Sequence, residues 1–597
     1  MSHVDIPEHR DGSTVGVEVL PATTAGAALQ PTLHDDTRVG SPTSEKEKKS
    51  PSSVAAAEGD KEQTQLDVEY PKGLKFALIN LSVNLVVFLV ALDQTIVSTA
   101  VPVITNEFNS FSDVGWYASA YLLTSTAFQP LFGRLYGSFS IKYVFLASFF
   151  IFEIGSLICA VAQDSPTFIV GRAIAGLGLA GAYSGCLIII SVVAPLHIRP
   201  LLTSLTGATY GIGGTIGPII GGAFTSRVTW RWNFYINLCF IPLLVPVILF
   251  FLKTPPRKQE RTVAQRILRI DWLGTVLILA SLICLLLVFQ DAGIKYAWSD
   301  SKAIGLLVGF VVILIAFIID QWWMGERATI PFRILKNRTV WGGSIVNFTV
   351  ASCYFGLLYF LPIYHQTVKG TSAIRSGVLM LPFIVGVIIS VTLQGGFTNA
   401  TGHYIPLLLG GTLIMTAGSA ALYALSPTSD VARIAGLEIL AGIGPGLSFM
   451  VPFTAVSSIL DVKDIEIGAA IVIFWQTGGG TVATSMAQSI FQNKFVLYVR
   501  QVPGADAAAI LSKGVSAFRA TTPAELLPTI IDAANKALGK IWIMTAVLGG
   551  VAFLSVFAMD LKGRVDVEAS KAAEKNKKEK RRGSTDPEAV DATAVAA

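Results

Sequence analysis

The stretch that decides the fold is "TYGIGGTIGPIIGGAF", residues 209–224. Six of its sixteen residues are glycine, one is proline and none is charged. In a water-soluble protein this composition would indicate a loop, because glycine and proline weaken helices. The sequence on both sides is strongly apolar, which instead favours a helix in lipid. The composition of the whole chain decides between these interpretations.

The chain as a whole has the composition of a membrane protein. Of its 597 residues, 52% are hydrophobic and only 14% are charged, and the mean hydropathy is +0.60. A bilayer core about 30 Å thick needs roughly 20 apolar residues for each helical crossing. The glycine-rich stretch lies in the fifth of fourteen segments that meet this need. These segments lie near residues 74–104, 113–133, 142–162, 168–192, 201–224, 232–252, 272–290, 303–323, 340–362, 375–396, 406–425, 432–455, 466–490 and 540–560.

Basic residues in the short loops predict the orientation of the chain. Lysine and arginine crowd the loops after the sixth and eighth segments, and short basic loops stay in the cytoplasm. Both termini are therefore predicted to be cytoplasmic, although some outer loops also carry basic residues, such as Arg227 and Arg231. The net charge of +5 is spread over loops and tails, which predicts no binding to nucleic acid.

Cysteine and histidine patterns indicate neither a metal site nor an enzyme. The five cysteines fall inside predicted segments without paired spacing, so we expect no disulfide and no metal. The six histidines are scattered, and no H-E-x-x-H or comparable pattern occurs. The sequence therefore predicts a protein without a metal or an organic cofactor.

Two parts of the chain resemble each other. "RAIAGLG", Arg172 to Gly178, and "EILAGIG", Glu438 to Gly444, each place a charge four residues before Gly-x-Gly. "GRLYGSFSIKY", from Gly133, and "GGFTNATGHY", from Gly395, give a weaker match. Both pairs are offset by eight segments, as expected for two related six-helix halves, which is how many secondary transporters are built.

The repeat and the polar tails together predict the domain organisation. The tails are polar and poor in aromatic residues, so they cannot bury enough apolar surface to fold. The predicted parts are a disordered cytoplasmic tail (1–70), a six-helix bundle (71–253), a basic loop with two inserted spans (254–330), a second six-helix bundle (331–562) with an extracellular segment (491–539), and a disordered basic tail (563–597).

Four ionisable side chains lie inside predicted membrane segments, namely Asp93, Glu153, Arg172 and Glu438. A charge at the bilayer centre costs on the order of 3 kcal/mol, so each should face water, pair, or lose its charge. A carboxyl group in a low-dielectric cleft can take and release a proton near neutral pH, which is what a proton-coupled carrier needs. Asp93 is the first candidate, and a structural ion pair with Arg172 is the alternative. For Glu153 a bond to a neighbouring helix is favoured, and for Glu438 both interpretations stay open.

Polar and aromatic side chains in the predicted segments indicate a substrate cavity. A cavity lined by aromatic rings with few fixed charges suits bulky, weakly polar organic molecules. A helix-packing role is the alternative for each residue. The predicted lining residues are Gln94, Tyr121, Asn347, Tyr354, Trp475, Gln476 and Gln488.

The glycines of the opening stretch share one helix face. Gly213, Gly217 and Gly221 recur every four residues, and in lipid such small residues let two helix backbones approach each other. Pro218 removes one backbone hydrogen bond and bends the helix. The stretch therefore predicts a bent helix that is packed tightly against another.

These residues resemble a known family. "GGTIGPIIGG" is similar to the antiporter signature G-x-x-x-G-P-x-x-G-G of the major facilitator superfamily. "LDQTIVSTAVP" (92–102), "GRAIAGLGLAG" (171–181) and "WRWNFYIN" (230–237) resemble segments of its fourteen-span drug:proton antiporters. The resemblance covers about residues 70–562. The signature positions are Gly213, Gly217, Pro218, Gly221 and Gly222.

The resemblance implies an all-α membrane protein with two six-helix bundles and two extra transmembrane helices, fourteen spans in total. It implies export of organic compounds by alternating access, driven by the proton gradient without a cofactor. Asp93 matches the acidic position of the first span, and Arg172 matches the arginine of the fourth span that is associated with proton coupling. The strongest likeness is to fungal toxin and multidrug efflux pumps.

One family motif is incomplete in this chain. The loop motif G-x-L-x-D-x-x-G-R-[RK] follows the second span, and Gly137 stands at its acidic position. The charged contact between helices that the motif provides is therefore not expected here. The matching positions are Gly133, Leu135 and Lys142.

The sequence predicts a monomeric plasma-membrane exporter whose partners are lipid, protons and amphipathic organic molecules. A vacuolar or amino-acid carrier of the same superfamily is the alternative, which an anionic cavity would favour. A channel is disfavoured because no ring of charges or filter-like loop occurs. A membrane sensor that transports nothing is a further alternative that the sequence does not decide. The direction of transport rests on the resemblance, and no residue pattern identifies the substrate.

Overall fold

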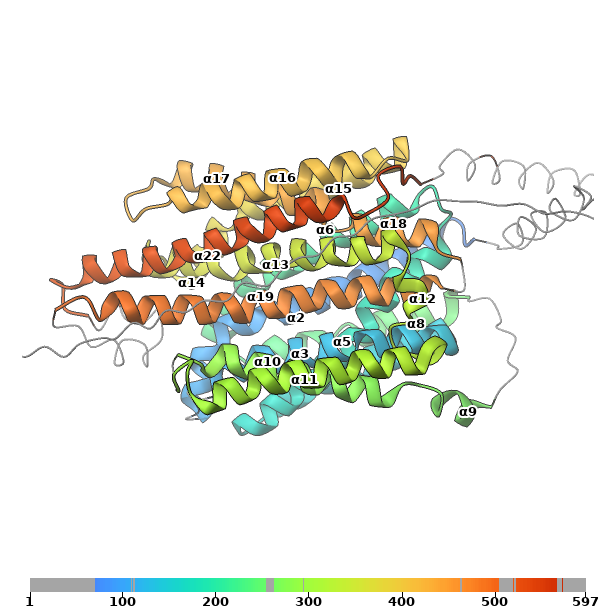
Figure 1. Ribbon diagram of the computed structural model, residues 1–597, viewed down its shortest axis with the longest axis horizontal. Coiled ribbons are helices and arrows are strands. Elements are labelled where there is room, and N and C mark those ends of the chain that lie inside the picture. Colours follow the sequence, from blue (N-terminus) through green and yellow to red (C-terminus); the bar gives the residue numbers. More distant parts are fainter. Residues whose placement is uncertain are drawn as a thin grey trace, which may run out of the picture. The chain divides into compact units, whose positions relative to one another are not determined.

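The computed structural model describes residues 70–108, 110, 113–253, 262–293, 295–461, 464–503, 519, 522–565 and 572. Figure 1 shows their long helices lying side by side along a common direction. The two predicted disordered tails lie almost entirely outside the described residues, and so do residues 254–261 of the basic loop after the sixth predicted span.

The helices follow the predicted order. The first bundle contains α2 (Leu74–Phe108), α3 (Val114–Ser138), α4 (Ile141–Val161), α5 (Ser165–Val193), α6 (Arg199–Arg227), and α7 (Trp232–Leu238) with α8 (Ile241–Phe251). Between the bundles lie α9 (Val263–Ile267), α10 (Trp272–Asp291), α11 (Ser301–Met324) and η2 (Gly325–Arg327). The second bundle contains α12 (Phe332–Leu335), α13 (Arg338–Thr367), α14 (Ala373–Leu379) with α15 (Leu381–Thr401), α16 (Ile405–Ala421) with η3 (Leu422–Ala424), α17 (Val431–Ser448) with α18 (Val451–Ile459), α19 (Ile465–Val499) and α22 (Leu527–Val556).

Three of the membrane segments are broken into two helices. Each break lies just before a proline at the start of the following helix, namely Pro242, Pro382 and Pro452. Proline disfavours the helical conformation for the residue before it and lacks a backbone donor. The breaks are therefore local consequences of the sequence.

Twelve helices among the described residues are long and apolar enough to cross a bilayer. The twelve do not include α3 and α6, which have 25 and 29 residues. Both coincide with predicted segments, but their many glycine, serine and threonine residues lower their hydropathy. The count of fourteen spans therefore stays a prediction.

The last predicted loop is shorter in the structure than in the prediction. The segment 491–539 was expected to connect two spans, but α19 continues to Val499 and α22 already begins at Leu527. These helix ends mix apolar residues with polar ones such as Asn493, Lys494 and Asp532, which lowers their hydropathy. An ion pair between Lys536 and Asp532 (2.8 Å), one turn apart, lies on such a polar turn of α22.

The two bundles repeat the same close helix contacts. A Cβ atom on Gly176 would overlap the Tyr121 carbonyl of α3, and one on Gly442 would overlap the Phe383 carbonyl of α15. In the same way, the backbone of α4 excludes a side chain at Gly178, and the backbone of α16 excludes one at Gly444. The Gly-x-Gly motifs of α5 and α17 therefore occupy equivalent positions in the two halves.

The glycine face of α6 packs against α2. A Cβ atom on Gly213 would lie 2.6 Å from the Phe88 carbonyl oxygen, and one on Gly221 would lie 2.5 Å from that of Ile96. Gly217 lies against Thr95, and Pro218 is inside the helix. Gly222 points elsewhere, with Ile374 as its nearest contact at 3.6 Å. Only glycine permits this approach of the two backbones.

The inserted helix α10 packs where α3 of the first bundle meets α19 of the second, and α11 packs on α10. Gln290 of α10 donates a hydrogen bond to Ser119 of α3 (2.6 Å), and Asn493 of α19 donates one to the Ala292 carbonyl (3.3 Å). The face of α11 that points away from α10 exposes large apolar side chains, including Val308, Val312 and Ile319. This face is suited to contact with lipid.

A polar cluster holds the inserted helices to the bundles at the end that carries the basic loops. Asp271 accepts hydrogen bonds from the Gly274 amide (2.6 Å), from Gln321 (2.6 Å) and from the Thr329 amide (3.0 Å) and hydroxyl (2.8 Å). Burial alone would raise the pKa of Asp271, but the hydrogen bonds from Gln321, Gly274 and Thr329 outweigh it and hold the pKa below its ordinary value.

Arg333 joins the same end of the molecule to α19. Its guanidinium donates two hydrogen bonds to Asp464 (2.9 Å each) and one to Glu326 (3.0 Å). Nearby, Arg134 of α3 donates to the Ala328 carbonyl (2.7 Å). These contacts lie beside the incomplete loop motif. Of the motif residues, Gly133 lies against Ala470 of α19, Leu135 packs on the apolar core, and Lys142 donates to the Leu249 carbonyl.

Candidate functional site

The first bundle holds a fully buried ion pair between α2 and α5. Arg172 Nη1 lies 2.7 Å from Asp93 Oδ2, and the two side chains are 1% and 0% exposed. Asn237 donates to the other oxygen of Asp93 (3.2 Å), and Arg172 Nε donates to the Tyr117 carbonyl (3.1 Å). The charges of this pair are therefore compensated, as a buried ion pair requires.

Tyr121 covers this ion pair. The guanidinium of Arg172 lies 4.1 Å from the centre of the Tyr121 ring, a cation–π contact. The Tyr121 hydroxyl donates to the Val90 carbonyl (3.4 Å). Tyr121 was predicted to line the cavity, but the structure places it over Arg172.

Glu153 on α4 is also buried, with 3% of its side chain exposed. Neither carboxyl oxygen has a hydrogen-bond partner among the residues that the structure describes. The favoured interpretation, a bond to a neighbouring helix, therefore finds no support in these residues. An ionised carboxylate without hydrogen bonds would carry a large desolvation cost at this position.

The second bundle holds a different buried pair, between α13 and α17. His365 Nε2 lies 2.7 Å from Glu438 Oε1, and both side chains are 0% exposed. His365 Nδ1 and Glu438 Oε2 have no hydrogen-bond partner within the described part of the chain. Sequence analysis selected Glu438 but not His365, because a single histidine near a helix end carries no recognisable pattern.

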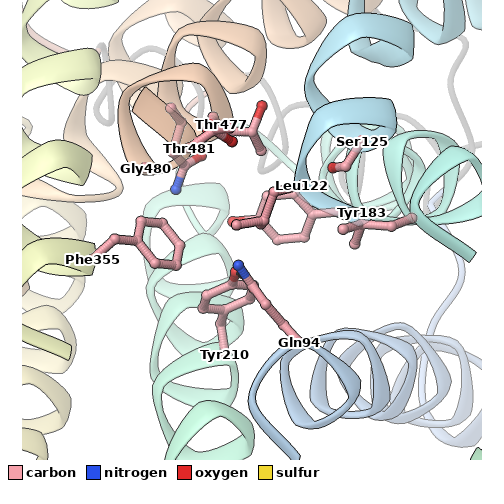
Figure 2. Close-up of a pocket in the computed structure, with 11 residues that line it drawn as sticks. Gln94, Leu122, Ser125, Tyr183, Tyr210, Phe355, Thr477, Gly480 and Thr481 are labelled. Atoms are coloured by element: carbon pink, nitrogen blue, oxygen red, sulfur yellow. Dashed lines mark hydrogen bonds between the residues drawn. The ribbon is translucent and has the colours of Figure 1, made fainter. Parts of the chain in front are cut away.

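A cavity lies between the two bundles. Figure 2 shows Gln94 and Tyr210 on one side of it, Phe355 on another, and Thr477 and Thr481 opposite. The lining comes from α2, α3, α5 and α6 of the first bundle and from α13 and α19 of the second. The lining residues are Gln94, Leu122, Ser125, Leu179, Tyr183, Tyr210, Phe355, Gln476, Thr477, Gly480 and Thr481.

The cavity lining is aromatic and polar without charge. The rings of Tyr183 and Tyr210 lie 5.4 Å apart, and Tyr210 meets Phe355 edge-on at 6.4 Å. The Tyr210 hydroxyl donates to the Gln94 side-chain oxygen. Hydroxyl and amide groups can orient a ligand, while the rings supply apolar contact area. The arrangement suits a flat, uncharged organic molecule.

The structure brings two of the seven predicted cavity residues, Gln94 and Gln476, to this cavity. Tyr354 lines a smaller neighbouring one of about 260 Å³. Asn347 donates to the Val472 carbonyl (3.1 Å) and so joins α13 to α19. Trp475 packs on Phe348, with ring centres 5.9 Å apart. Gln488 is half-buried on α19, away from both cavities.

The sequence patterns do not predict Tyr183 and Tyr210, which line the cavity. Tyr183 lies in "GAYSG" and Tyr210 in "TYGIG". In both cases an aromatic residue stands among small ones on a helix, which leaves open space around the ring. This local contrast in side-chain size was the available signal.

Comparison with known proteins identifies the family. A sequence profile described as Major Facilitator Superfamily matches residues 83–484. The MFS-type transporter astH of Aspergillus oryzae is 39% identical over 564 residues, which cover 92% of this chain and 99% of that protein. The Aspyridones efflux protein of Neocamarosporium betae is 40% identical over 483 residues, which cover 80% of this chain and 86% of that protein.

A solved structure shows the same fold. The proton:xylose symporter XylE of the major facilitator superfamily superimposes with a TM-score of 0.53 at 16% identity, covering 83% of this chain and 98% of that one. The predicted all-α fold with two six-helix bundles is therefore confirmed. The chain is a multi-pass membrane transporter, not an enzyme, and belongs to the Major Facilitator Superfamily.

Proposed function

We propose that this protein exports uncharged, aromatic organic molecules, such as secondary metabolites, in exchange for protons. The similarity to a protein named for aspyridone efflux supports the direction of transport. The absence of charged side chains from the described cavity lining supports the substrate class.

One observation carries the coupling of substrate to protons. Gln94 faces the cavity and binds the Tyr210 hydroxyl, while its neighbour Asp93 binds Arg172 on the inner side of α2. Because the two residues are adjacent, a substrate that displaces Tyr210 from Gln94 acts on the same helical turn as the ion pair. Substrate binding and proton binding therefore compete through α2.

The proton step proceeds on Asp93. A proton that binds the carboxylate removes its charge and weakens its bond to Arg172, which keeps its contacts with the Tyr117 carbonyl and the Tyr121 ring. The guanidinium cannot release a proton, so Asp93 carries the change. Glu153 and Glu438 are secondary candidates, and the proton gradient replaces any cofactor.

The amino-acid carrier is the second candidate. An amino acid brings a carboxylate and an ammonium group, and each needs a charged or strongly polar partner in the cavity. The described lining offers only hydroxyl and amide groups, which favours the exporter. We place the protein in the plasma membrane as a monomer with both termini in the cytoplasm, and a vacuolar location is the alternative.

Transport in proteoliposomes tests the proposal. A neutral polyphenolic dye and a lipophilic cation would be offered to the intact protein under an imposed pH gradient. We expect accumulation of the neutral dye, loss of the gradient-driven part in Asp93→Asn, and retention of downhill exchange. Asp532→Asn, an exposed residue on α22, is the matched control and should behave like the intact protein.

Two results would contradict the proposal. Transport that ignores the pH gradient would remove the proton roles of Asp93 and Arg172. Preference for the cation over the neutral dye would show that the uncharged cavity does not select the substrate.

A further inference from the structure

The two bundles hold their buried pairs at equivalent places. Arg172 on α5 and Glu438 on α17 each lie four residues before a Gly-x-Gly motif that makes the same contacts in both halves. Their partners, Asp93 and His365, lie on α2 and α13, the first long helix of each bundle. The base and the acid have exchanged places between the halves, but the pairing of helices is the same.

The chemistry of the two pairs differs. A guanidinium stays protonated at every pH at which proteins are folded, so only Asp93 can change its charge in the first pair. An imidazole changes its charge between about pH 5 and 8 unless its surroundings prevent it. Both members of the second pair are therefore groups of a kind that can gain or lose a proton.

The second pair also has free atoms where a proton can bind. His365 Nδ1 and Glu438 Oε2 are buried and lack a hydrogen-bond partner among the described residues. By contrast, Asn237 occupies the second oxygen of Asp93. His365 lies in the last turn of α13, where the helix dipole favours a positive charge. The predicted topology places this helix end on the extracellular side.

Several other ionisable groups surround the buried pair. At this end of α13 and α17 they are Tyr364, Lys369, Arg375, Asp430, Arg433 and Arg519. Lys369 donates to the carbonyls of Pro427 (2.8 Å) and Ser429 (2.6 Å), and Arg519 donates to those of Thr367 (2.8 Å) and Val368 (2.6 Å). The Tyr364 ring lies 5.6 Å from His365, and its hydroxyl donates to the Ser426 carbonyl. Within the described residues none of these groups forms a hydrogen bond or ion pair with His365 or Glu438.

We propose that the His365–Glu438 pair is a second proton-binding site, so that the transporter exchanges two protons for each substrate molecule. This inference rests on the proposed proton-coupled export. The first proton binds Asp93. The second proton reaches His365 Nδ1 or Glu438 Oε2 from the side of the membrane on which α13 ends, and there it forms only an N–H or O–H bond. It is then released to water on the opposite side of the membrane.

The number of exchanged protons is measurable in proteoliposomes. With the membrane potential clamped at zero, the limiting gradient of a neutral substrate should be about 100-fold per pH unit for two protons and about 10-fold for one. We expect about 100-fold for the intact protein and about 10-fold for the double variant His365→Gln with Glu438→Gln. This variant keeps a side-chain hydrogen bond between the two helices while removing both titrating groups.

A second measurement tests the pair directly. The chain has six histidines, so the imidazole ¹⁵N NMR signal of His365 in the purified intact protein is identified by its loss in His365→Gln. We expect this signal to change with pH while the protein stays folded, and its midpoint to shift in Glu438→Gln.

The outcomes separate the two proposals. A gradient of about 10-fold in the intact protein, or of about 100-fold in the double variant, overturns the second site and leaves proton-coupled export standing. If the intact protein accumulates nothing, proton-coupled export is wrong, and with it the second exchanged proton. An imidazole signal that does not respond to pH, combined with a gradient that is unchanged in the double variant, overturns the inference, because the pair is then purely structural.

Discussion

The two bundles use one helix framework for two kinds of buried pair. In the first, Arg172 is a permanent cation that lies 2.7 Å from an oxygen of Asp93. In the second, the base is an imidazole, which unlike a guanidinium has a neutral form, so the pair with Glu438 has no fixed ion. The difference shows that a duplicated fold can keep its glycine contacts while the chemistry between equivalent helices changes.

The largest expected effect is the loss of stability when the basic side chain of each buried pair, Arg172 or His365, is replaced. Arg172→Gln removes the cation of a fully buried pair together with its hydrogen bond to the Tyr117 carbonyl and its contact with the Tyr121 ring, which should cost about 3–5 kcal/mol of stability. His365→Gln should cost about 1–3 kcal/mol, because Glu438 can bind a proton and remain neutral. Thermal unfolding in detergent at several pH values measures both. Equal losses in the two variants would break the comparison between the pairs.

A second prediction sharpens the structural equivalence of the halves. Gly176→Ala and Gly442→Ala each insert a methyl group into a neighbouring backbone, and each should cost about 1–3 kcal/mol by overpacking. Gly436→Ala on α17 is the matched control, because a Cβ atom there meets nothing within 4 Å. Unfolding midpoints of the three variants decide whether the halves respond alike. A large loss in only one half would contradict the equivalence.

Asp271 provides a third kind of buried carboxylate, held by neutral donors instead of a cation or a histidine. Its pKa is lowered in the folded protein, so its contribution to stability is present above the unfolded pKa and is lost as pH falls through the folded pKa. Asp271→Asn should cost about 1–2 kcal/mol at neutral pH and make acid unfolding less steep. Parallel acid-unfolding curves for variant and intact protein would contradict this role.

The smallest expected effect concerns the cavity between the bundles. Tyr210→Phe removes the hydrogen bond to Gln94 and keeps the ring contacts. A hydrogen bond contributes about 1 kcal/mol, so KM for the transported substrate should change about fivefold. Transport kinetics in proteoliposomes measure this change. An unchanged KM would indicate that substrate does not contact this pair of residues.

The helices were predictable from the sequence, because hydropathy over about 20 residues detects a buried or lipid-facing helix directly. The repeat was predictable from two Gly-x-Gly motifs, since helix crossings require glycine at these positions. Polar helix ends, such as the first turns of α22, were missed because they lie outside the apolar stretch.

The site was only partly predictable. Asp93, Arg172 and Glu438 stood out because charges are rare in lipid, and the pairing of Asp93 with Arg172 was among the alternatives. His365 and Tyr210 could not be selected, since their importance depends on which helices face each other. Asn347 and Trp475 have the composition of cavity residues but face α19 and Phe348. Rotation about a helix axis, which sequence does not reveal in an all-apolar helix, decides these cases.

The contact between Arg333 and its two acids has a consequence for kinetics. The Arg333 side chain is about half exposed, and exposed ion pairs contribute little because water and salt screen them. The neighbouring contact between Gly133 and Ala470 is apolar and insensitive to salt. Separation of α3 from α19 at this end should therefore have a rate that depends on side-chain size at residue 133 and hardly at all on ionic strength.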